Sequence, residues 1–356
     1  MTSIKDIARL AGVSPSTVSR VINDKEYVRA EIRDRVKAIV KEKGYVQNHA
    51  ARSMVLRRTF TVGIVIPDTF NMFQRQLFAT IEHHLEEQGY RTMFIFVTWS
   101  AESESACLRK LKSESLDGII MMHEVQNPAV YKYLHEYSVP VVLCTFGSED
   151  FPFPAVRVDE CAAAEAAVAH LMDWGHRRIG IIAGTHFRFS VQRAEGYRRV
   201  FESRGMEPPK DSWKATVPSY SLEEGRRGMA RLLRQDSTIT AVFAMTDELA
   251  IGAMRTLHEA GLKVPEDLSV VGFDDIDISA YTAPALTTIR QPIREMGERT
   301  AALICDLIAE GKAEGSPFVL EHRLIERESV ASPKGAPRDS STQDGAPRLG
   351  TGGLGL

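Results

Sequence analysis

The chain has 356 residues, too many for one ordinary hydrophobic core, so its length indicates two or three compact units. Hydrophobic residues make up 44% and charged residues 26%, as in soluble globular proteins, and no apolar run is long enough to predict a membrane span. Within the net charge of -3, residues 1–58 hold 13 Lys or Arg and six Asp or Glu, a net +7, which leaves -10 for the remainder. We therefore expect only the first segment to meet a polyanion, because clustered Lys and Arg displace the counterions of phosphates.

The chain begins MTSIKDIARLAG, which lacks the charged segment and apolar core of a secretory signal, so we expect a cytoplasmic protein. The four cysteines, Cys107, Cys144, Cys161 and Cys305, are widely spaced and form no CxxC pair. They are interpreted as reduced, buried thiols, and neither a metal site nor another cofactor is expected.

Residues 2–44 carry the pattern of three short helices. The first ends at Gly12, which can adopt the positive φ of a tight turn. The second begins with Ser14 as N-cap and Pro15 at the first helical position, and the third runs from about Ala30 to Lys43. Two helices joined by a short turn that contains Gly are typical of a helix-turn-helix, so residues 1–46 are predicted to be an all-α DNA-binding domain.

The second helix of this segment has one apolar and one polar face. Val18, Val21 and Ile22 point inward, and the positions left outside are Ser16, Thr17, Ser19 and Arg20. Short hydroxyl side chains with one Arg suit contacts to base edges and phosphates. The alternative is a three-helix protein-binding module with an ordinary solvated face, and this pattern alone leaves it open.

From Thr59 onward, short apolar runs alternate with longer helical patterns, which predicts α/β architecture with parallel sheets. About 270 residues of this pattern are too many for one sheet, so two lobes are expected. The predicted strands are 60–66, 91–97, 117–122, 139–144, 178–184, 240–245 and 268–273. The predicted helices lie around 73–88, 102–111, 161–174, 191–204, 222–234, 247–260 and 292–310.

Polar residues that follow strands are candidate ligand contacts, because doubly wound sheets bind ligands beyond the carboxyl ends of their strands. Asp68, Asp247, Asp274 and Asp275 occupy such positions. Asp247 precedes ELAIGAM and also fits a helix N-cap, whereas the pair at 274 and 275 adjoins no obvious helix. The segment 331–356 is rich in Gly, Pro and Ser and is expected to be disordered.

Six segments in this order resemble the LacI/GalR family of transcriptional regulators over about residues 3–330. They are IKDIARLAGVSPSTVSRVIN, GYVQNHAARSM, VGIVIPDTFNMF, HLMDWGHRRIGIIAG, TDELAIGAM and PEDLSVVGFDDIDISAYTAPALTTIRQP. The resemblance implies a repressor whose helix-turn-helix head is followed by a hinge at 47–59 and a two-lobed, periplasmic-binding-protein-like sensor at 60–330. It also implies a homodimer that reads a pseudo-palindromic double-stranded operator.

By the same resemblance, a set of residues in the head and hinge would contact DNA. The set is Ser14, Pro15, Ser16, Thr17, Ser19, Arg20, Asn23, Asn48, Ala51 and Met54. Residues 48–56 match the family's hinge helix, in which Met54 takes the place of the usual leucine as the wedge between bases. From its residues alone, HAARSMVLRR is a short basic linker.

The resemblance further implies a sensor with three crossovers between its lobes. Lobe one would comprise about 60–158 and 291–318, and lobe two about 159–290 and 319–330. A sugar-like effector would lie between them, and the residues implied as its contacts are Phe73, Gln74, Phe189, Arg193, Tyr220, Asp247, Asp274 and Gln291. An aromatic face with an Arg and carboxylates suits a polyol, although Phe189 and Tyr220 also fit ordinary packing.

The chain departs from the family where NMFQRQLF replaces NPFF, so Gln74 and Arg75 leave open an acidic or larger ligand. A periplasmic sugar-binding protein would have a signal peptide and no basic head. An enzyme is not expected, because the chain has no P-loop, GxSxG or HExxH motif and no GxGxxG after a strand.

Overall fold

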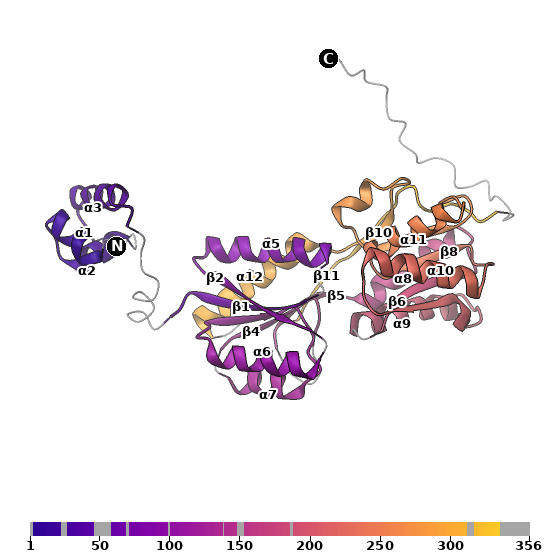
Figure 1. Ribbon diagram of the computed structural model, residues 1–356, viewed down its shortest axis with the longest axis horizontal. Coiled ribbons are helices and arrows are strands. Elements are labelled where there is room, and N and C mark those ends of the chain that lie inside the picture. Colours follow the sequence, from indigo (N-terminus) through magenta and orange to yellow (C-terminus); the bar gives the residue numbers. More distant parts are fainter. Residues whose placement is uncertain are drawn as a thin grey trace, which may run out of the picture. The chain divides into compact units, whose positions relative to one another are not determined.

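A computed structural model describes residues 3–22, 27–45, 58–68, 71–98, 100–137, 139–147, 153–185, 188–311 and 317–334 (Figure 1). The first compact unit contains the head, and the second comprises nearly all of the remaining chain. Each unit is described by itself.

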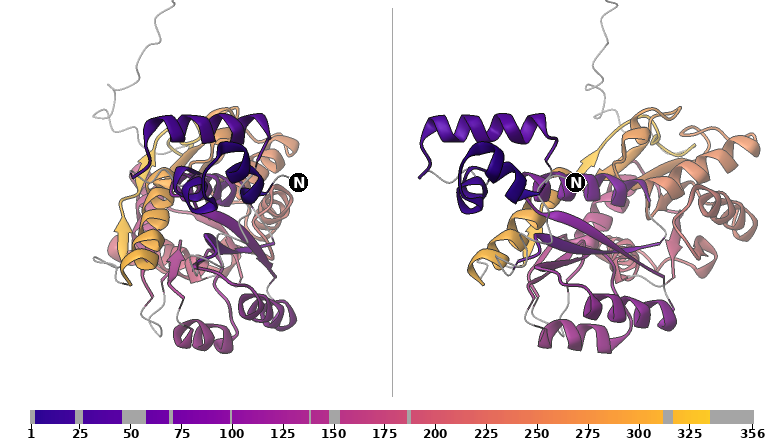
Figure 2. Two further views of the ribbon diagram at one scale, coloured as in Figure 1. Left: turned by 90° about the vertical axis from the view of Figure 1, so that its left-hand side faces the viewer. Right: turned by 60° about the vertical axis from the view of Figure 1, so that its left-hand side comes forward.

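The head contains three helices, α1 (Ile4–Ala11), α2 (Pro15–Ile22) and α3 (Ala30–Glu42) (Figures 1 and 2). Ile7, Val18, Val21 and Val36 are fully buried where the three helices meet. Gly12 ends α1 with a φ of +65°, a left-handed conformation that glycine adopts without steric cost. The predicted turn between α1 and α2 is therefore confirmed.

Lobe one is built on a six-stranded sheet in the order β11-β5-β4-β3-β1-β2. The strands are β1 (Thr61–Pro67), β2 (Arg91–Val97), β3 (Gly118–Met121), β4 (Val141–Cys144), β5 (Ala155–Val158) and β11 (Phe318–Leu320). The helices are α5 (Met72–Glu87), α6 (Ala101–Ser113), α7 (Pro128–Glu136) and α12 (Ile293–Glu310). Helices α5 and α12 cover one face of the sheet and α6 and α7 the other (Figures 1 and 2).

Lobe two repeats this plan with a sheet in the order β12-β10-β9-β8-β6-β7. The strands are β6 (Ile179–Gly184), β7 (Lys214–Val217), β8 (Ala241–Ala244), β9 (Ser269–Asp274), β10 (Thr287–Arg290) and β12 (Arg323–Ile325). The helices are α8 (Glu160–Asp173), α9 (Arg188–Ser203), α10 (Leu222–Gln235) and α11 (Asp247–Glu259), with short 3-10 turns at Asp211–Trp213 and Asp277–Ala280. β12 pairs with β10 in antiparallel fashion, and the other pairings recorded in this sheet are parallel.

The chain passes between the lobes three times: after β5, after β10 and after β11. β11 extends to Leu320, two residues beyond the predicted last crossover, because Phe318 to Leu320 pair with β5 of lobe one. The two-lobed α/β fold class predicted from the sequence is confirmed.

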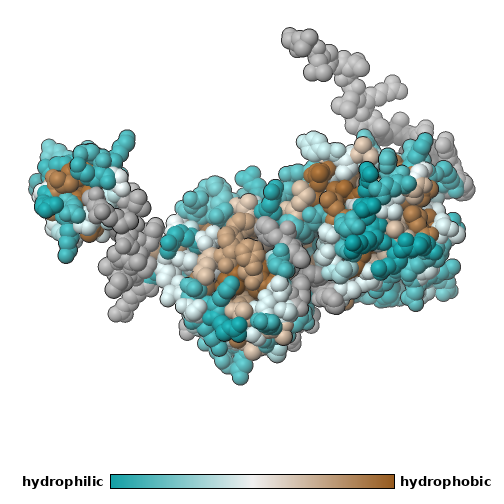
Figure 3. All heavy atoms as spheres, in the orientation of Figure 1, coloured by the Kyte–Doolittle hydropathy of each residue, from teal (hydrophilic) through white to brown (hydrophobic). Residues whose placement is uncertain are grey.

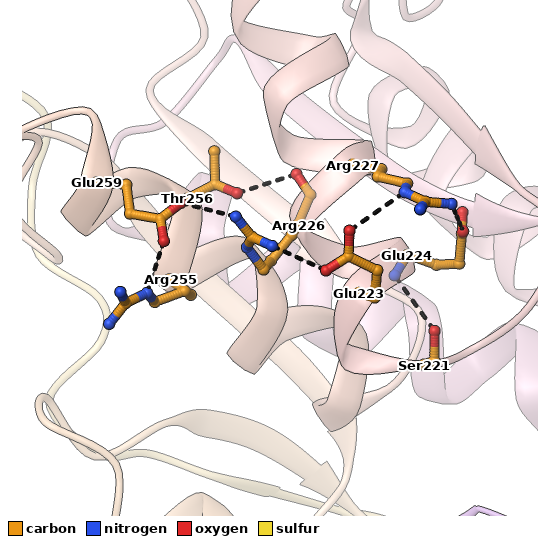
Figure 4. Close-up of polar contacts among 8 residues, drawn as sticks. All are labelled: Ser221, Glu223, Glu224, Arg226, Arg227, Arg255, Thr256 and Glu259. Carbon is orange, nitrogen blue, oxygen red and sulfur yellow. Dashed lines mark hydrogen bonds and ion pairs between the residues drawn. The ribbon is translucent and has the colours of Figure 1, made fainter.

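Helices α10 and α11 of lobe two pack so closely that their contact leaves no room for a side chain at two glycines. A Cβ at Gly252 would lie 2.0 Å from the carbonyl oxygen of Leu222, and one at Gly225 would lie 2.3 Å from that of Leu249. Arg226 bridges Glu223 and Glu259 across the same pair of helices (Figure 4). In the view of Figure 3, hydrophilic side chains cover much of this lobe.

The seven predicted strands and seven predicted sensor helices are all present, each shifted by a few residues at most. The sequence prediction missed α7, β5, β7, β10, β11 and β12. It also placed Ala331 in a disordered tail, but the backbone N–H and C=O of Ala331 are bonded to Ser269 and His176 of lobe two. The tail from residue 335 onward lies outside the described residues.

Candidate functional site

The polar face predicted on the second helix is present on α2. Ser14, Pro15, Ser16 and Arg20 are exposed, and Thr17 and Ser19 are half-buried. The Ser14 hydroxyl accepts a hydrogen bond of 3.1 Å from the Thr17 N–H, which confirms it as the cap of α2. The Ser14 hydroxyl also lies 2.7 Å from that of Ser16, so short hydroxyl groups gather at the N-terminus of the helix, where oriented N–H groups attract phosphate.

Four predicted DNA contacts, Asn23, Asn48, Ala51 and Met54, lie outside the described residues. The hinge therefore stays a prediction.

A second cluster of polar and aromatic side chains lies at the carboxyl ends of the lobe-two strands. Tyr220 follows β7, Asp247 follows β8, Asp274 ends β9 and Gln291 follows β10, while the first turns of α9 carry Phe189 and Arg193. The parallel pairing of β6, β8, β9 and β10 brings these strand ends to one edge of the sheet.

Arg193 is the centre of this cluster and is only 3% exposed. Its Nε donates to Glu160 at 2.7 Å, its Nη1 donates to the carbonyl oxygen of Met245, and its Nη2 lies 3.8 Å from Asp274. The guanidinium carbon sits 3.5 Å from the centroid of the Phe273 ring and 4.8 Å from that of Phe189. Two carboxylates and two aromatic faces thus fix the position of a buried cation.

Asp274 and Gln291 form the polar wall beside Arg193. Gln291 Nε2 donates to Asp274 Oδ1 at 2.7 Å, whereas Gln291 Oε1 is buried and has no hydrogen-bond partner among the described residues. Asp274 has a φ of +117°, a strained conformation for an L residue that is typical of functional positions. Burial raises the pKa of Asp274 well above its usual value, although Arg193 lowers it in part.

Asp247 has a different surrounding from the one predicted for a ligand contact. It is fully buried, and its carboxylate accepts from Thr288 Oγ1 at 2.5 Å, Ser279 Oγ at 2.7 Å and the Ile276 N–H at 2.9 Å. Burial raises its pKa to about 7 against the effect of these donors. The N-cap of α11 is Thr246, not Asp247. Asp247 therefore holds the segment after β9, through Ile276 and Ser279, against Thr288 of β10.

Phe189 and Tyr220 lie together next to Arg193. Their ring centroids are 5.2 Å apart, and the Tyr220 hydroxyl is hydrogen-bonded to Ser190. Burial raises the pKa of Tyr220, so its phenol stays neutral. A Cβ at Gly184 would lie 2.0 Å from the Tyr220 oxygen, so this place in the site requires glycine.

On lobe one, the predicted contacts Phe73 and Gln74 lie at the start of α5. Phe73 is buried in the core of lobe one, and Gln74 Oε1 accepts from the Asn71 N–H in a capping box. The two lobes meet here, because the Met72 N–H donates to Glu248 of α11 at 3.2 Å. A second contact joins Glu124 of lobe one to Arg188 of α9 at 3.0 Å.

Sequence reasoning missed Glu160, which is 4% exposed and is the closest charged partner of Arg193. The signal was an acidic pair, Asp159 and Glu160, directly after a strand, but β5 itself was not predicted. Of the other two strand-end candidates, Asp275 is paired with Arg290 at 2.5 Å and with Arg327 at 2.6 Å, and Asp68, directly after β1, is exposed.

Both parts of the chain match families of known proteins. Residues 3–48 match the bacterial regulatory proteins of the lacI family, and residues 168–330 match the periplasmic binding protein-like domain. The chain is 32% identical to the ribose operon repressor of Haemophilus influenzae over 94% of its own length and all of that protein. The chain belongs to the lacI family.

Two solved structures extend this comparison. The lac repressor dimer bound to operator and the anti-inducer ONPF is 26% identical, with a TM-score of 0.81 over 92% of this chain and 99% of that one. A LacI family regulator from Enterococcus faecium with bound ribose is 33% identical, with a TM-score of 0.68 over 76% of this chain and 99% of that one. The resemblance stated from the sequence is confirmed.

Substitution of Glu160 tests whether the buried cation depends on it. We expect Glu160→Ala to lower the free energy of unfolding, measured in urea, by about 3 to 5 kcal/mol, because the buried Arg193 guanidinium loses its closest carboxylate. Glu165→Ala is the control: this carboxylate on the same helix pairs with exposed Arg199 at 3.6 Å, and we expect a loss of about 1 kcal/mol or less. Equal losses in the two variants would contradict the role given to Glu160.

Proposed function

We propose that this lacI-family protein is a cytoplasmic transcriptional repressor whose operator affinity is set by an uncharged, sugar-like ligand bound between the sensor lobes. In this proposal it binds a pseudo-palindromic operator as a homodimer, as the related lac repressor dimer binds its operator. The residues that face the DNA are the N-cap Ser14 and, on α2, Pro15, Ser16, Thr17, Ser19 and Arg20. Arg193, Asp274, Gln291, Phe189 and Tyr220 receive the ligand, with the start of α5 as the opposite wall.

The observation that carries this ligand class is the buried, unsatisfied acceptor Gln291 Oε1. Buried polar atoms in folded proteins nearly always have a partner, so this oxygen is suited to a donor supplied by a ligand. Asp274, beside it, also accepts. A ligand hydroxyl can donate to Gln291 Oε1, whereas an ionised carboxylate or phosphate group brings only acceptors to it.

Charge supports the same ligand class. Arg193 is already bonded to Glu160 and faces Asp274. Because the charge of Arg193 is already compensated, an anionic ligand would gain no free counter-charge from it, so the acidic ligand that Gln74 and Arg75 left open is not favoured. Gln74 is engaged in its capping box, and Arg75 is exposed on α5. The ribose bound in the related Enterococcus faecium regulator supports a sugar.

Regulation follows from differential binding. Arg193, Asp274 and Gln291 are at most 4% exposed in the described arrangement, so a ligand enters when the lobes separate and stabilises the arrangement that encloses it. Operator affinity then changes if the open and the ligand-enclosing arrangements of the lobes differ in their affinity for the operator. Catalysis is not part of the proposal, and the relatives are repressors rather than enzymes.

The operator face is tested with Arg20→Ala. From a random duplex pool, the tightest-binding sequence is selected and compared with a scrambled duplex at fixed salt. We expect Arg20→Ala to reduce the affinity ratio of the two duplexes roughly five- to 150-fold, equivalent to about 1 to 3 kcal/mol of base discrimination. Arg9→Ala, an exposed Arg on α1, should weaken both duplexes alike and keep the ratio. An unchanged ratio in Arg20→Ala would reject α2 as the reading helix.

The ligand class is tested by thermal unfolding with D-ribose, D-glucose, cellobiose, D-gluconate and ribose 5-phosphate. We expect an uncharged sugar to raise the Tm, since a ligand at a hundred times its Kd stabilises the fold by about 2.7 kcal/mol. Asp274→Ala should abolish that shift, and Asp277→Ala, an exposed carboxylate three residues further, should retain it. A shift produced only by gluconate or ribose 5-phosphate, and kept in Asp274→Ala, would reject the proposed site.

A further inference from the structure

Strand β3 of lobe one ends in two polar clusters that neither the operator face nor the ligand site uses. We propose that β3 couples the effector cleft to the linker, with Glu124 and Arg188 as the positioning pair at its carboxyl end. At its amino end, Asp117 positions Thr59 and Phe60, the residues that lead into β1. The inference has a structural half, that Glu124 and Asp117 are coupled through β3, and a regulatory half, that this coupling alters operator affinity. The regulatory half rests on the proposed function, and the structural half does not.

The amino-terminal cluster is a clamp made by one carboxylate. Asp117 Oδ1 accepts from the Thr59 N–H at 2.9 Å and from the Thr59 hydroxyl at 3.2 Å, and Oδ2 accepts from the Phe60 N–H at 2.6 Å. The Asp117 N–H in turn donates to the Thr61 carbonyl oxygen at 2.9 Å. Phe60 has a φ of +52°, and such a conformation costs on the order of 1 to 3 kcal/mol for a residue with a side chain. Asp117 thus stabilises an unfavourable bend of the backbone.

The position of this bend gives it regulatory importance. Residues 58 and 59 end the predicted hinge segment at 47–59 and Phe60 follows it, so the chain from the head reaches β1 through them. A change of φ at Phe60 redirects the chain toward the hinge. The Asp117 carboxylate is therefore placed to fix the direction in which the linker leaves β1.

The carboxyl-terminal cluster lies at the contact of the two lobes. Glu124, three residues beyond β3, accepts from Arg188 Nε at 3.0 Å and from the Arg188 N–H at 3.3 Å. The side chains of Glu124 and Arg188 are 18% and 37% exposed. Arg188 begins α9, the helix that carries Phe189 and Arg193 of the ligand site. A ligand that moves the start of α9 therefore acts on Glu124 as well.

The strand between the clusters is suited to pass on such a displacement. All four residues of β3 are buried, and the strand pairs with β1 from Val62–Gly118 to Val65–Met121 and with β4 on its other side. The Val125 N–H donates to the Tyr131 hydroxyl, which fixes the turn beyond Glu124 to α7. Because interiors are close-packed and barely compressible, a shift at one end of such a strand reaches the other.

Hydrogen exchange of the full chain, without DNA or ligand, tests the structural half. In wild type, the Thr59 and Phe60 amides are bonded to Asp117, so a peptide covering 58–62 should exchange slowly. We expect Glu124→Gln and Asp117→Asn each to speed exchange in this peptide about tenfold or more. Lys132→Gln is the matched control, because it removes an exposed pair with Glu136 on α7 and should change nothing at 58–62. Faster exchange in Glu124→Gln confined to α9 would overturn the coupling.

Operator binding tests the regulatory half on the same variants. With the duplex selected for wild type, we expect the Kd of Glu124→Gln and of Asp117→Asn to change at least fivefold. The operator Kd of the double variant should equal that of a single variant, since the two substitutions act on the same strand and their effects should not add. If Asp117→Asn fails to fold, Glu124→Gln still tests both halves. Faster exchange in the variants with an unchanged operator Kd would overturn the regulatory half and leave operator binding intact. If the wild-type protein selects no duplex from the random pool, the proposed function itself is overturned.

Discussion

One guanidinium, that of Arg193, lies almost entirely out of water at the carboxyl edge of the lobe-two sheet, and the rest of the sensor is arranged to keep it there. A buried charge is costly unless it is paired and hydrogen-bonded. Glu160 from the start of α8, the Met245 carbonyl oxygen beyond β8, and Asp274 at the end of β9 meet that requirement. Each comes from a different strand end or helix start. The folding of the whole lobe is therefore needed to assemble the site, and any ligand must enter an already balanced set of charges.

That balance links recognition to regulation. Glu160 and Gln291 stand at two of the three crossovers between the lobes, directly after β5 and β10. The chain therefore changes lobe at the same places where it contributes ligand-site residues. A ligand that fills the acceptors beside Arg193 acts on the connections between the lobes, while α9 connects the same site through Arg188 to Glu124 of lobe one. In the proposed function, the edge of one sheet therefore combines ligand binding, charge compensation and the connections between the lobes.

The sequence predicted much of this architecture, and the failures have physical causes. Runs such as TVGIVI and SVVGF are continuous and apolar because both faces of a parallel sheet are buried, so their strands were recognised. The strands AVRV, KATV and TTIR are four residues long and contain Arg, Lys or Thr, which hides them from a pattern based on hydrophobicity. Asp247 and Asp274 each follow a predicted strand, and the sequence separates them only by the helical pattern after Asp247. Their surroundings depend on residues distant in the chain. Thr288, Ser279 and the Ile276 N–H surround Asp247, and Arg193 and Gln291 lie beside Asp274.

Effector binding and operator binding occur in one chain, and linkage requires that each alter the affinity of the other by the same factor. The most direct measurement is the affinity of wild-type protein for its stabilising sugar, by calorimetry, with and without a saturating amount of the selected operator duplex. The account predicts that operator changes the sugar Kd by the same factor as sugar changes the operator Kd, about fivefold or more. Equal sugar affinity with and without operator would contradict it.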